Sequence, residues 1–326
     1  MTGKYLISAE SELEQTYPDK IKPLMRSLVK GRFEGHSGIN ISYAHLSHPE
    51  EKGAVAISTG RIESWVKYQE VMFDLYQNGY SVFIHDHRGQ GLSDRMTQNP
   101  QMGFVHDFAD YVADFKVFYQ QVIEPNTQHK PQLLCHSMGC AIGALYVLAH
   151  PQDFAQLIVC APMFGIRPAL PNWLANILIG TNLLISRGLG HDASYFPGQR
   201  NYRETEFALN ELTHSNIRYR LFRDEYNLQP EVQLGGVTGH WLRAALRAMD
   251  TIEAQASQIR LPVWAIQAGD DTVVDNKRQS RVLAEIPHCE VQHIAGARHE
   301  MLLEEDQYRE PCLEAILAFL QLAPAR

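Results

Sequence analysis

Three residues of the types that cooperate in nucleophilic catalysis lie far apart in the chain, in the order Ser137, Asp271 and His299. A serine hydroxyl is a poor nucleophile until an imidazole takes its proton, and a carboxylate fixes the tautomer of that imidazole. The order predicts a serine hydrolase with Ser137 as nucleophile, His299 as general base and Asp271 as orienting acid.

The surroundings of Ser137 distinguish it from other serines. The apolar run Gln132–Cys135 leads into Ser-x-Gly at 137–139, and a helical pattern rich in small residues follows. A sharp strand-to-helix turn of this kind exposes a serine oxygen, whereas Ser58 and Ser186 begin Ser-x-Gly elsewhere without that context. The alternatives are a helix N-cap at Ser137, or Cys135 as nucleophile, which placement in a buried strand disfavours.

Position also selects the acid and the base. Asp271 lies in the loop after the apolar run Val263–Gln267, and His299 lies in a short loop after Glu290–Ile294. Asp270 is the alternative acid, and Asp275 is expected to cap the next helix. The chain has 15 histidines, so the residue type alone would not single out His299.

The oxyanion hole requires two backbone N–H donors. One is expected from Met138, next to the nucleophile, and the other from Arg61, in the loop after the first buried strand, where Gly60 gives the turn its freedom. That loop could also be a simple strand-to-helix connection. His85 and His87 would share a strand face, but no third ligand is suitably spaced, so we expect neither a metal nor a cofactor.

Short apolar runs alternate with amphipathic patterns along the chain, which predicts an α/β fold with a mostly parallel central sheet flanked by helices. The predicted strands are Ala54–Ser58, Ser81–His85, Gln132–Cys135, Leu157–Cys160, Val263–Gln267 and Glu290–Ile294. An antiparallel edge hairpin is predicted from Arg32–Glu34 and Asn40–His45. The predicted helices are Trp65–Tyr76, Phe108–Val122, Gly139–Leu148, Asn276–Ile286 and Tyr308–Leu320.

The region 163–251 interrupts this alternation, with several prolines and no clear strand. We expect it to form a helical cap inserted into a core made of residues 1–162 and 252–326. Its apolar stretch Trp173–Ile185 is too short to span a bilayer. It could lie on a membrane surface, line a tunnel for an acyl chain, or pack its apolar side on the protein. Nearby arginines that could meet a lipid phosphate are Arg167, Arg187, Arg200 and Arg203.

Composition narrows the class of protein. The 326 residues are 45% hydrophobic with a formal net charge of −8, which argues against a nucleic-acid partner. The five cysteines have no C-x-x-C pair and indicate reduced thiols. No apolar run occurs in the first 17 residues, so no secretory signal is expected. These features predict a cytoplasmic protein, and the apolar stretch of the cap could give it peripheral membrane contact.

Five motifs together resemble the monoacylglycerol lipase and lysophospholipase group of α/β-hydrolases: residues 58–64, 85–93, 136–139, 269–274 and 297–300. Within the group, segments 161–166, 210–213 and 234–238 are most similar to bacterial lysophospholipases of the inner membrane. Thr59 departs from the His-Gly usual in the lipases. The resemblance implies the α/β-hydrolase fold, the catalytic residues Ser137, Asp271 and His299, and oxyanion donors at Arg61 and Met138.

The leading hypothesis is hydrolysis of the ester of a monoacyl lipid, a lysophospholipid above all, through an acyl-Ser137 intermediate. Expected substrate contacts are Gly60, Ile62, Phe164, Trp173 and Ile177. Alternatives are a monoacylglycerol lipase, a general carboxylesterase, a peptidase or a lipid acyltransferase. A non-catalytic protein that binds a hydrophobic ligand is a further alternative, against which the complete Ser, Asp and His series argues.

Overall fold

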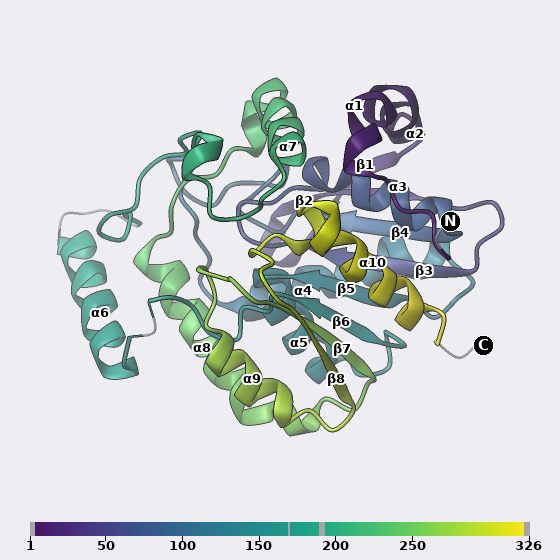
Figure 1. The fold of residues 1–326 in the computed structure, drawn as a ribbon. Coiled ribbons are helices and arrows are strands. Elements are labelled where there is room, and N and C mark those ends of the chain that lie inside the picture. Colours follow the sequence, from purple (N-terminus) through teal and green to yellow (C-terminus); the bar gives the residue numbers. More distant parts are fainter. Residues whose placement is uncertain (1–3, 169, 189–192, 323–326) are drawn as a thin grey trace.

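A single eight-stranded sheet organises the chain (Figure 1). The structure, a computed structural model, describes residues 4–168, 170–188 and 193–322. The strands are β1 (Val29–Glu34), β2 (Asn40–Leu46), β3 (Gly53–Ser58), β4 (Tyr80–His85), β5 (Gln132–His136), β6 (Leu157–Cys160), β7 (Val263–Ala268) and β8 (Cys289–Ile294). Every predicted strand is confirmed, with ends displaced by a few residues at most.

The strand order is β1-β2-β4-β3-β5-β6-β7-β8. Strand β2 pairs antiparallel with β1 and β4, and all other pairs are parallel. The predicted edge hairpin and the mostly parallel sheet are therefore confirmed. Because β3, β5, β7 and β8 run in the same direction, the loops that follow them meet at one edge of the sheet.

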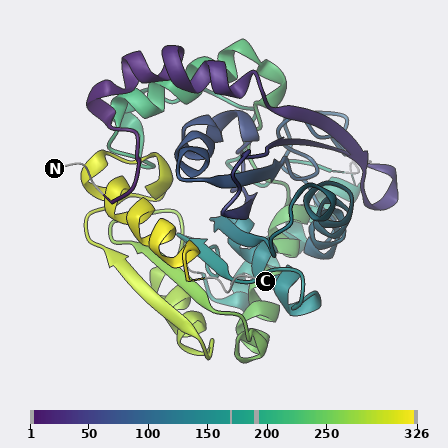
Figure 2. The ribbon, with the colours of Figure 1, turned by 90° about the vertical axis from the view of Figure 1, so that its right-hand side faces the viewer.

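Helices cover both faces of the sheet (Figures 1 and 2), and alternate residues of the strands face the two layers. Ala54 and Ala56 belong to one buried cluster, and Val55 and Ile57 to the other. The first cluster is covered by α4 (Phe108–Phe118), α5 (Met138–Ala149), α8 (Gly239–Gln255) and α9 (Asn276–Ala284). The second is covered by α3 (Gln69–Gln77), α10 (Asp306–Leu320) and the N-terminal helical turns α1 (Leu13–Thr16) and α2 (Lys22–Met25).

The helices expected from the sequence are present with modest shifts. A 3₁₀ turn at Trp65–Tyr68 leads into α3, and a π-helical turn at Tyr119–Ile123 extends α4. The N-terminal helical turns, over Glu10–Met25, were not predicted.

The predicted cap segment, 163–251, contains α6 (Asn172–Gly188), α7 (Asn216–Leu228) and all but the last four residues of α8, which ends at Gln255. Helix α8 packs against α5 and α4, and α6 packs against α8 at the edge of the molecule, where Figure 1 shows it projecting. A Cβ at Gly239 of α8 would lie 2.4 Å from the Asn182 side chain of α6, so glycine permits this close contact. The division into core and cap stays a prediction.

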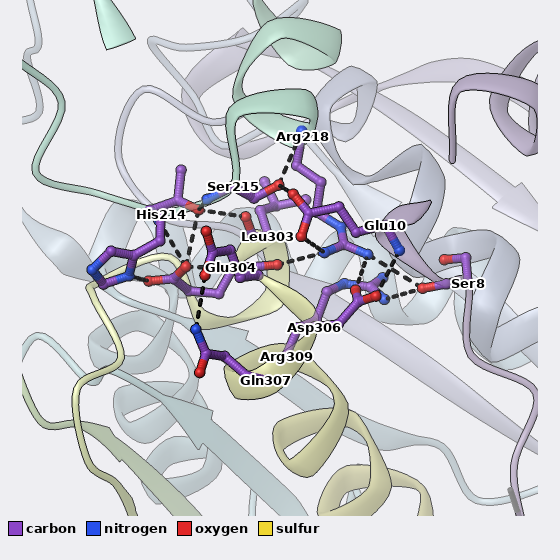
Figure 3. A network of polar contacts seen from close by, with 12 residues as sticks. Ser8, Glu10, His214, Ser215, Arg218, Leu303, Glu304, Asp306, Gln307 and Arg309 are labelled. Atoms are coloured by element: carbon purple, nitrogen blue, oxygen red, sulfur yellow. Dashed lines mark hydrogen bonds and ion pairs between the residues drawn. The ribbon is translucent and has the colours of Figure 1, made fainter. Parts of the chain in front are cut away.

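A buried ionic network joins α7 to the N-terminal segment and α10 (Figure 3). Arg218 of α7 is fully buried, donates to the Glu304 carbonyl at 2.6 Å, and forms ion pairs with Glu70 at 3.0 Å and Asp306 at 2.8 Å. Its Nη2 also donates to the Ser8 carbonyl at 3.2 Å. These contacts fix α7 against the core.

Candidate active site

Ser137 occupies the sharp turn between β5 and α5. Its backbone has φ 52° and ψ −116°, a conformation that non-glycine residues rarely adopt and that persists only where surrounding contacts hold it. Its N–H donates to the Cys160 carbonyl at 3.0 Å, and its carbonyl accepts from Met163 N–H at 3.1 Å. The strand-to-helix turn predicted from the sequence is thus present.

Small residues let α5 cross closely over the sheet. A Cβ at Gly139 would lie 2.1 Å from the Ser58 carbonyl oxygen, and one at Gly143 would lie 2.5 Å from Cys135 Sγ. Gly143 therefore leaves the space that the Cys135 side chain fills. Burial raises the pKa of the Cys135 thiol well above its usual value, which keeps it a protonated, unreactive group.

Ser137, His299 and Asp271 form one hydrogen-bonded row. His299 Nε2 lies 2.9 Å from Ser137 Oγ, and His299 Nδ1 lies 2.7 Å from Asp271 Oδ2. Asp271 Oδ1 accepts the backbone N–H groups of Val273 at 2.8 Å and Val274 at 3.0 Å. Burial would raise the pKa of Asp271, but the hydrogen bonds from His299 and these amides outweigh it and lower that pKa.

The alternative acids have other positions. Asp270 is exposed, and its backbone N–H donates to the Ala297 carbonyl at 2.9 Å. Asp275 caps α9 by accepting from Lys277 N–H at 3.0 Å, as predicted. Of the three aspartates, it is Asp271 that contacts the imidazole of His299.

The loop that carries Arg61 is held from several sides. Gln90 Nε2 donates to the Gly60 and Glu63 carbonyls, both at 2.8 Å. The Tyr226 hydroxyl of α7 donates to the Ile62 carbonyl at 2.9 Å, where Ile62 has a φ of 67° that is unusual for a β-branched residue. These bonds keep the Arg61 amide in a fixed loop, next to the nucleophile turn.

The segment 85–93 holds the end of the loop that carries Arg61 through the carboxylate of Asp86. Asp86 accepts from Ser64 Oγ at 2.8 Å and from the backbone N–H groups of Trp65 and Leu92, both at 2.7 Å. Burial raises the pKa of Asp86 to about 6. A Cβ at Gly91, whose φ is 56°, would lie 2.1 Å from the Asp86 carboxylate, so the second glycine of the motif is needed for this turn.

A buried cluster of charges adjoins the predicted catalytic residues. Glu63 contacts His136 Nδ1, at 3.1 Å from Oε1 and 3.2 Å from Oε2, and accepts from Lys67 Nζ at 3.1 Å. Lys67 also pairs with Glu300 at 2.5 Å. His136 Nε2 lies 3.1 Å from the His299 carbonyl. Since both ring nitrogens of His136 face acceptors, both must donate, and the ring is an imidazolium.

The cluster is therefore neutral overall, with two cations and two carboxylates. Burial disfavours the charged forms of His136 and Glu63, but the attraction between these two groups and to Lys67 and Glu300 is larger. The pKa of His136 is therefore raised, and that of Glu63 is lowered well below its usual range. Glu63 also accepts the Gly60 N–H. One carboxylate thus links the predicted oxyanion loop, the residue before Ser137 and, through His136, the backbone of His299.

This cluster was not predicted from the sequence. The signal available was that Glu63, His136 and Glu300 lie within the motifs at 58–64, 136–139 and 297–300, each beside a predicted catalytic or oxyanion residue. Because a buried charge is costly unless it is paired, charged residues inside these three motifs indicate that they pair with one another.

A cavity of about 850 Å³ opens onto the catalytic row. Ser137, His299, Gly60, Arg61 and Ile62 line it, together with residues of the segments 198–212, 222–226 and 234–236. Its size lies in the range of sites for small organic ligands. Two of the predicted substrate contacts, Gly60 and Ile62, therefore face the cavity beside Ser137.

The other predicted contacts lie elsewhere. Phe164 is buried in the cluster between the sheet and α5. Trp173 and Ile177 are 66% and 56% exposed on α6, outside this cavity. A second cavity, of about 550 Å³, lies under α6 and has apolar walls that include Leu178, Ile179, Phe196, Leu242 and Met249. Among the described residues, no group of side chains has the arrangement of a metal site.

A family model described as serine aminopeptidase, S33, matches residues 49–306. The chain belongs to the S33 family. Lysophospholipase L2 of Escherichia coli K12 is 35% identical over 307 residues, which cover 90% of this chain and 88% of that protein. Rat monoglyceride lipase is 26% identical over 229 residues, which cover 69% and 67% of the two chains.

Solved structures confirm that this S33 chain has the α/β-hydrolase fold. A soluble variant of Saccharomyces cerevisiae monoglyceride lipase, in complex with a substrate analogue, superposes with a TM-score of 0.70 at 19% identity and covers 92% of this chain and 96% of its own. A carboxyl esterase from Bacillus coagulans gives a TM-score of 0.69 at 18% identity, with 91% and 98% covered. The predicted fold and the resemblance to the lipase and lysophospholipase group are thus confirmed.

Proposed function

We propose that this S33-family chain is a lysophospholipase that cleaves the carboxylic ester of a monoacyl phospholipid. The observation that carries the proposal is the hydrogen-bonded row of Ser137, His299 and Asp271 at a cavity of about 850 Å³. The likeness to lysophospholipase L2 of Escherichia coli over nearly the whole of both chains supports the substrate class.

The reaction follows from the geometry. His299 Nε2 takes the proton as Ser137 Oγ bonds to the ester carbonyl carbon. The N–H groups of Arg61 and Met138 stabilise the resulting oxyanion, and Met138, as the first residue of α5, has no acceptor within its helix. Collapse breaks the ester C–O bond, and the leaving alcohol receives the proton from His299. Water, activated by the same imidazole, then releases the fatty acid from the acyl-Ser137 intermediate.

Hydrolysis of monoacylglycerols is the second candidate. The 26% identity to rat monoglyceride lipase over 229 residues favours it. The two substrates have the same acyl ester and differ in whether the glycerol carries a phosphate.

Labelling and turnover test the proposal. A fluorophosphonate probe should label the wild-type chain and fail to label Ser137→Ala. A panel of lysophosphatidylethanolamine, monoacylglycerol of the same acyl chain and short-chain nitrophenyl esters should show highest kcat/KM for the lysophospholipid. A chain that turns over short-chain esters alone would contradict the lipid assignment.

We also propose that α6 contacts the membrane that holds the substrate. Trp173, Ile177, Leu184 and Ile185 are each more than half exposed on this helix, while Ile179 on its other side is buried. Such an amphipathic helix can lie in the lipid interface. Among the described residues, no helix has both the length and the apolar character to cross a bilayer.

Flotation with vesicles of equal amounts of phosphatidylethanolamine and phosphatidylglycerol tests this contact. Trp173→Ser with Ile177→Ser should reduce the vesicle-bound fraction. Val29→Ser, at a comparably exposed position on edge strand β1, is the matched control and should not. Equal binding by all three proteins would refute the role of α6.

A further inference from the structure

The catalytic cavity contains a cation that lacks a counter-ion. Arg223 of α7 lines the cavity with Ser137 and His299. Its guanidinium donates to the hydroxyls of Tyr202 at 2.7 Å and Tyr219 at 2.9 Å, and lies 4.7 Å from the centre of the Phe222 ring. Among the residues that the structure describes, none places a carboxylate within ion-pair distance of it.

The other charges of the cavity offset one another. Lys67 and the His136 imidazolium balance Glu63 and Glu300. The exposed segment 198–206 contributes two arginines and two glutamates, Arg200, Arg203, Glu204 and Glu206. The charges left over are those of Arg223 and Arg61. Burial lowers the pKa of Arg61 to about 10, so it stays charged at neutral pH.

Arg61 and Arg223 are both held by neutral groups. Arg61 Nη1 donates to the Gly235 carbonyl at 2.9 Å, and its guanidinium lies 5.8 Å from the Trp241 ring centre. Hydroxyls, carbonyls and aromatic rings orient a guanidinium without cancelling its charge. The cavity wall therefore carries two positive charges that are available to an anionic ligand.

Helix α7 holds Arg223 at a defined place relative to the reacting atoms. Arg218, five residues earlier, is fixed in the buried ionic network. Tyr226, three residues later, bonds to the Ile62 carbonyl and accepts from the Ser64 N–H at 3.1 Å. Residues three apart on a helix are neighbours on its surface. Arg223 thus lies beside the point where α7 meets the predicted oxyanion loop.

The guanidinium still has donors to offer. It has five N–H groups, of which one on each terminal nitrogen is used by Tyr202 and Tyr219. Its Nε–H is buried without a partner. A phosphate oxygen is the acceptor that a planar guanidinium matches best, and a phosphodiester brings one negative charge.

We propose that Arg223 binds the headgroup phosphodiester of the lysophospholipid, with Arg61 supplying a second positive charge, and selects this substrate over neutral monoacylglycerols. The inference rests on the proposed function. In a lysophospholipid the phosphate and the acyl ester are attached to the same glycerol, so one cavity must hold both. The side chain that binds the phosphate acts on substrate affinity and takes no part in the bond-breaking steps.

The experiment compares Arg223→Gln with Arg220→Gln. Arg220 lies on the same helix, is exposed, and pairs with Glu14 at 2.6 Å. Initial rates are measured on lysophosphatidylethanolamine and on monoacylglycerol with the same acyl chain. We expect Arg223→Gln to lower kcat/KM for the lysophospholipid by about ten- to hundredfold, through KM. Its kcat/KM for monoacylglycerol should be unchanged, and Arg220→Gln should match the wild type on both.

Three results would overturn the inference or separate it from the proposed function. An equal loss on both substrates means that Arg223 only supports the cavity, and no loss on either means that it does not bind the headgroup. If wild-type protein turns over monoacylglycerol but no lysophospholipid, the proposed function fails. Lysophosphatidylethanolamine is then used as a competitor of monoacylglycerol: inhibition that is lost in Arg223→Gln supports the anion site, and absence of inhibition overturns it.

Discussion

The substitution Glu63→Gln tests whether the buried cluster positions the catalytic groups. Glu63 accepts from four donors: Gly60 N–H, Tyr68 hydroxyl at 2.6 Å, Lys67 Nζ and His136 Nδ1. Glutamine has nearly the same shape but one acceptor oxygen, and its NH₂ group would face donors. At least one of the four donors loses its acceptor, since Lys67 bonds to Oε1 and Gly60 and Tyr68 bond to Oε2, and Lys67 and His136 lose a counter-charge.

The expected magnitude follows from these losses. Removing one partner of a buried charge pair typically costs about 3–5 kcal/mol, and we expect a decrease of about 3 kcal/mol in the free energy of unfolding. One charge-assisted hydrogen bond is worth about 1.5–3 kcal/mol. If that bond is needed to hold the Gly60 loop and the His299 backbone in the transition state, kcat falls by about ten- to hundredfold.

The pH dependence should change in a defined direction. Because the pKa of His136 is raised above its usual 6.5, the stabilisation that it contributes is fully present below pH 6.5 and is lost as the pH rises through the folded-state value. Without the carboxylate of Glu63, the pKa of His136 falls, because burial is then opposed only by the Glu300 charge and the His299 carbonyl. His136 then loses its proton, and with it one of its two hydrogen bonds, at a lower pH than in the wild type.

Hydrolysis of a nitrophenyl ester over a range of pH, together with urea unfolding, measures these effects. The alkaline decline of kcat in Glu63→Gln should move to lower pH. Tyr68→Phe is the matched control, because it removes one donor and leaves the carboxylate charged, at a cost of about 1 kcal/mol. Wild-type kcat, pH profile and unfolding midpoint in Glu63→Gln would refute a positioning role for the cluster.

Three further substitutions have defined outcomes. Asp271→Asn should lower kcat for a nitrophenyl ester by about 10⁴-fold, because the amide favours the wrong tautomer of His299. Asp270→Asn is the control: Asp270 is exposed, and this change should alter kcat by no more than about twofold. Gly143→Ala should destabilise the protein in urea by about 1–3 kcal/mol, because its Cβ would meet Cys135 Sγ, and Cys135→Gly in the same chain should restore most of that loss. Arg218→Met should cost about 3 kcal/mol in thermal unfolding, because buried Glu70 keeps only Arg309, at 3.3 Å, among the described cations and Asp306 loses its cation.

The sheet and the catalytic row were predictable because both depend on local patterns. Strands buried on both faces have continuous apolar sequences, so their limits were found within a few residues. Parallel strands place the residues that follow them at one edge, so Ser137, Asp271 and His299 could be brought together from their order alone. The sequence favoured Asp271 and left Asp270 as the alternative, and in the structure it is Asp271 that lies 2.7 Å from His299 Nδ1.

Other contacts could not be predicted because they depend on how helices face one another. The sequence shows that α8 is amphipathic, but not that its apolar side packs on α5 and α4. Phe164 was expected at the substrate, but its side chain is buried in the core cluster that α4 and α5 cover. The contact between Glu63 and His136 joins residues 73 positions apart, and no local pattern encodes it.

Two arginines on α7 differ in whether a carboxylate pairs with them, and this difference distinguishes a structural role from a functional one. Arg218 faces the core and has carboxylates from Glu70 and Asp306, as a buried cation requires for stability. Arg223, little more than one helical turn later, lines the catalytic cavity, and its hydrogen-bond partners among the described residues are the hydroxyls of Tyr202 and Tyr219. If Arg223 served only for packing, the protein would be more stable with a carboxylate beside it, or with an apolar residue in its place. Departures from such local rules concentrate at functional sites, and the missing negative charge beside Arg223 is what the phosphate of a substrate would bring.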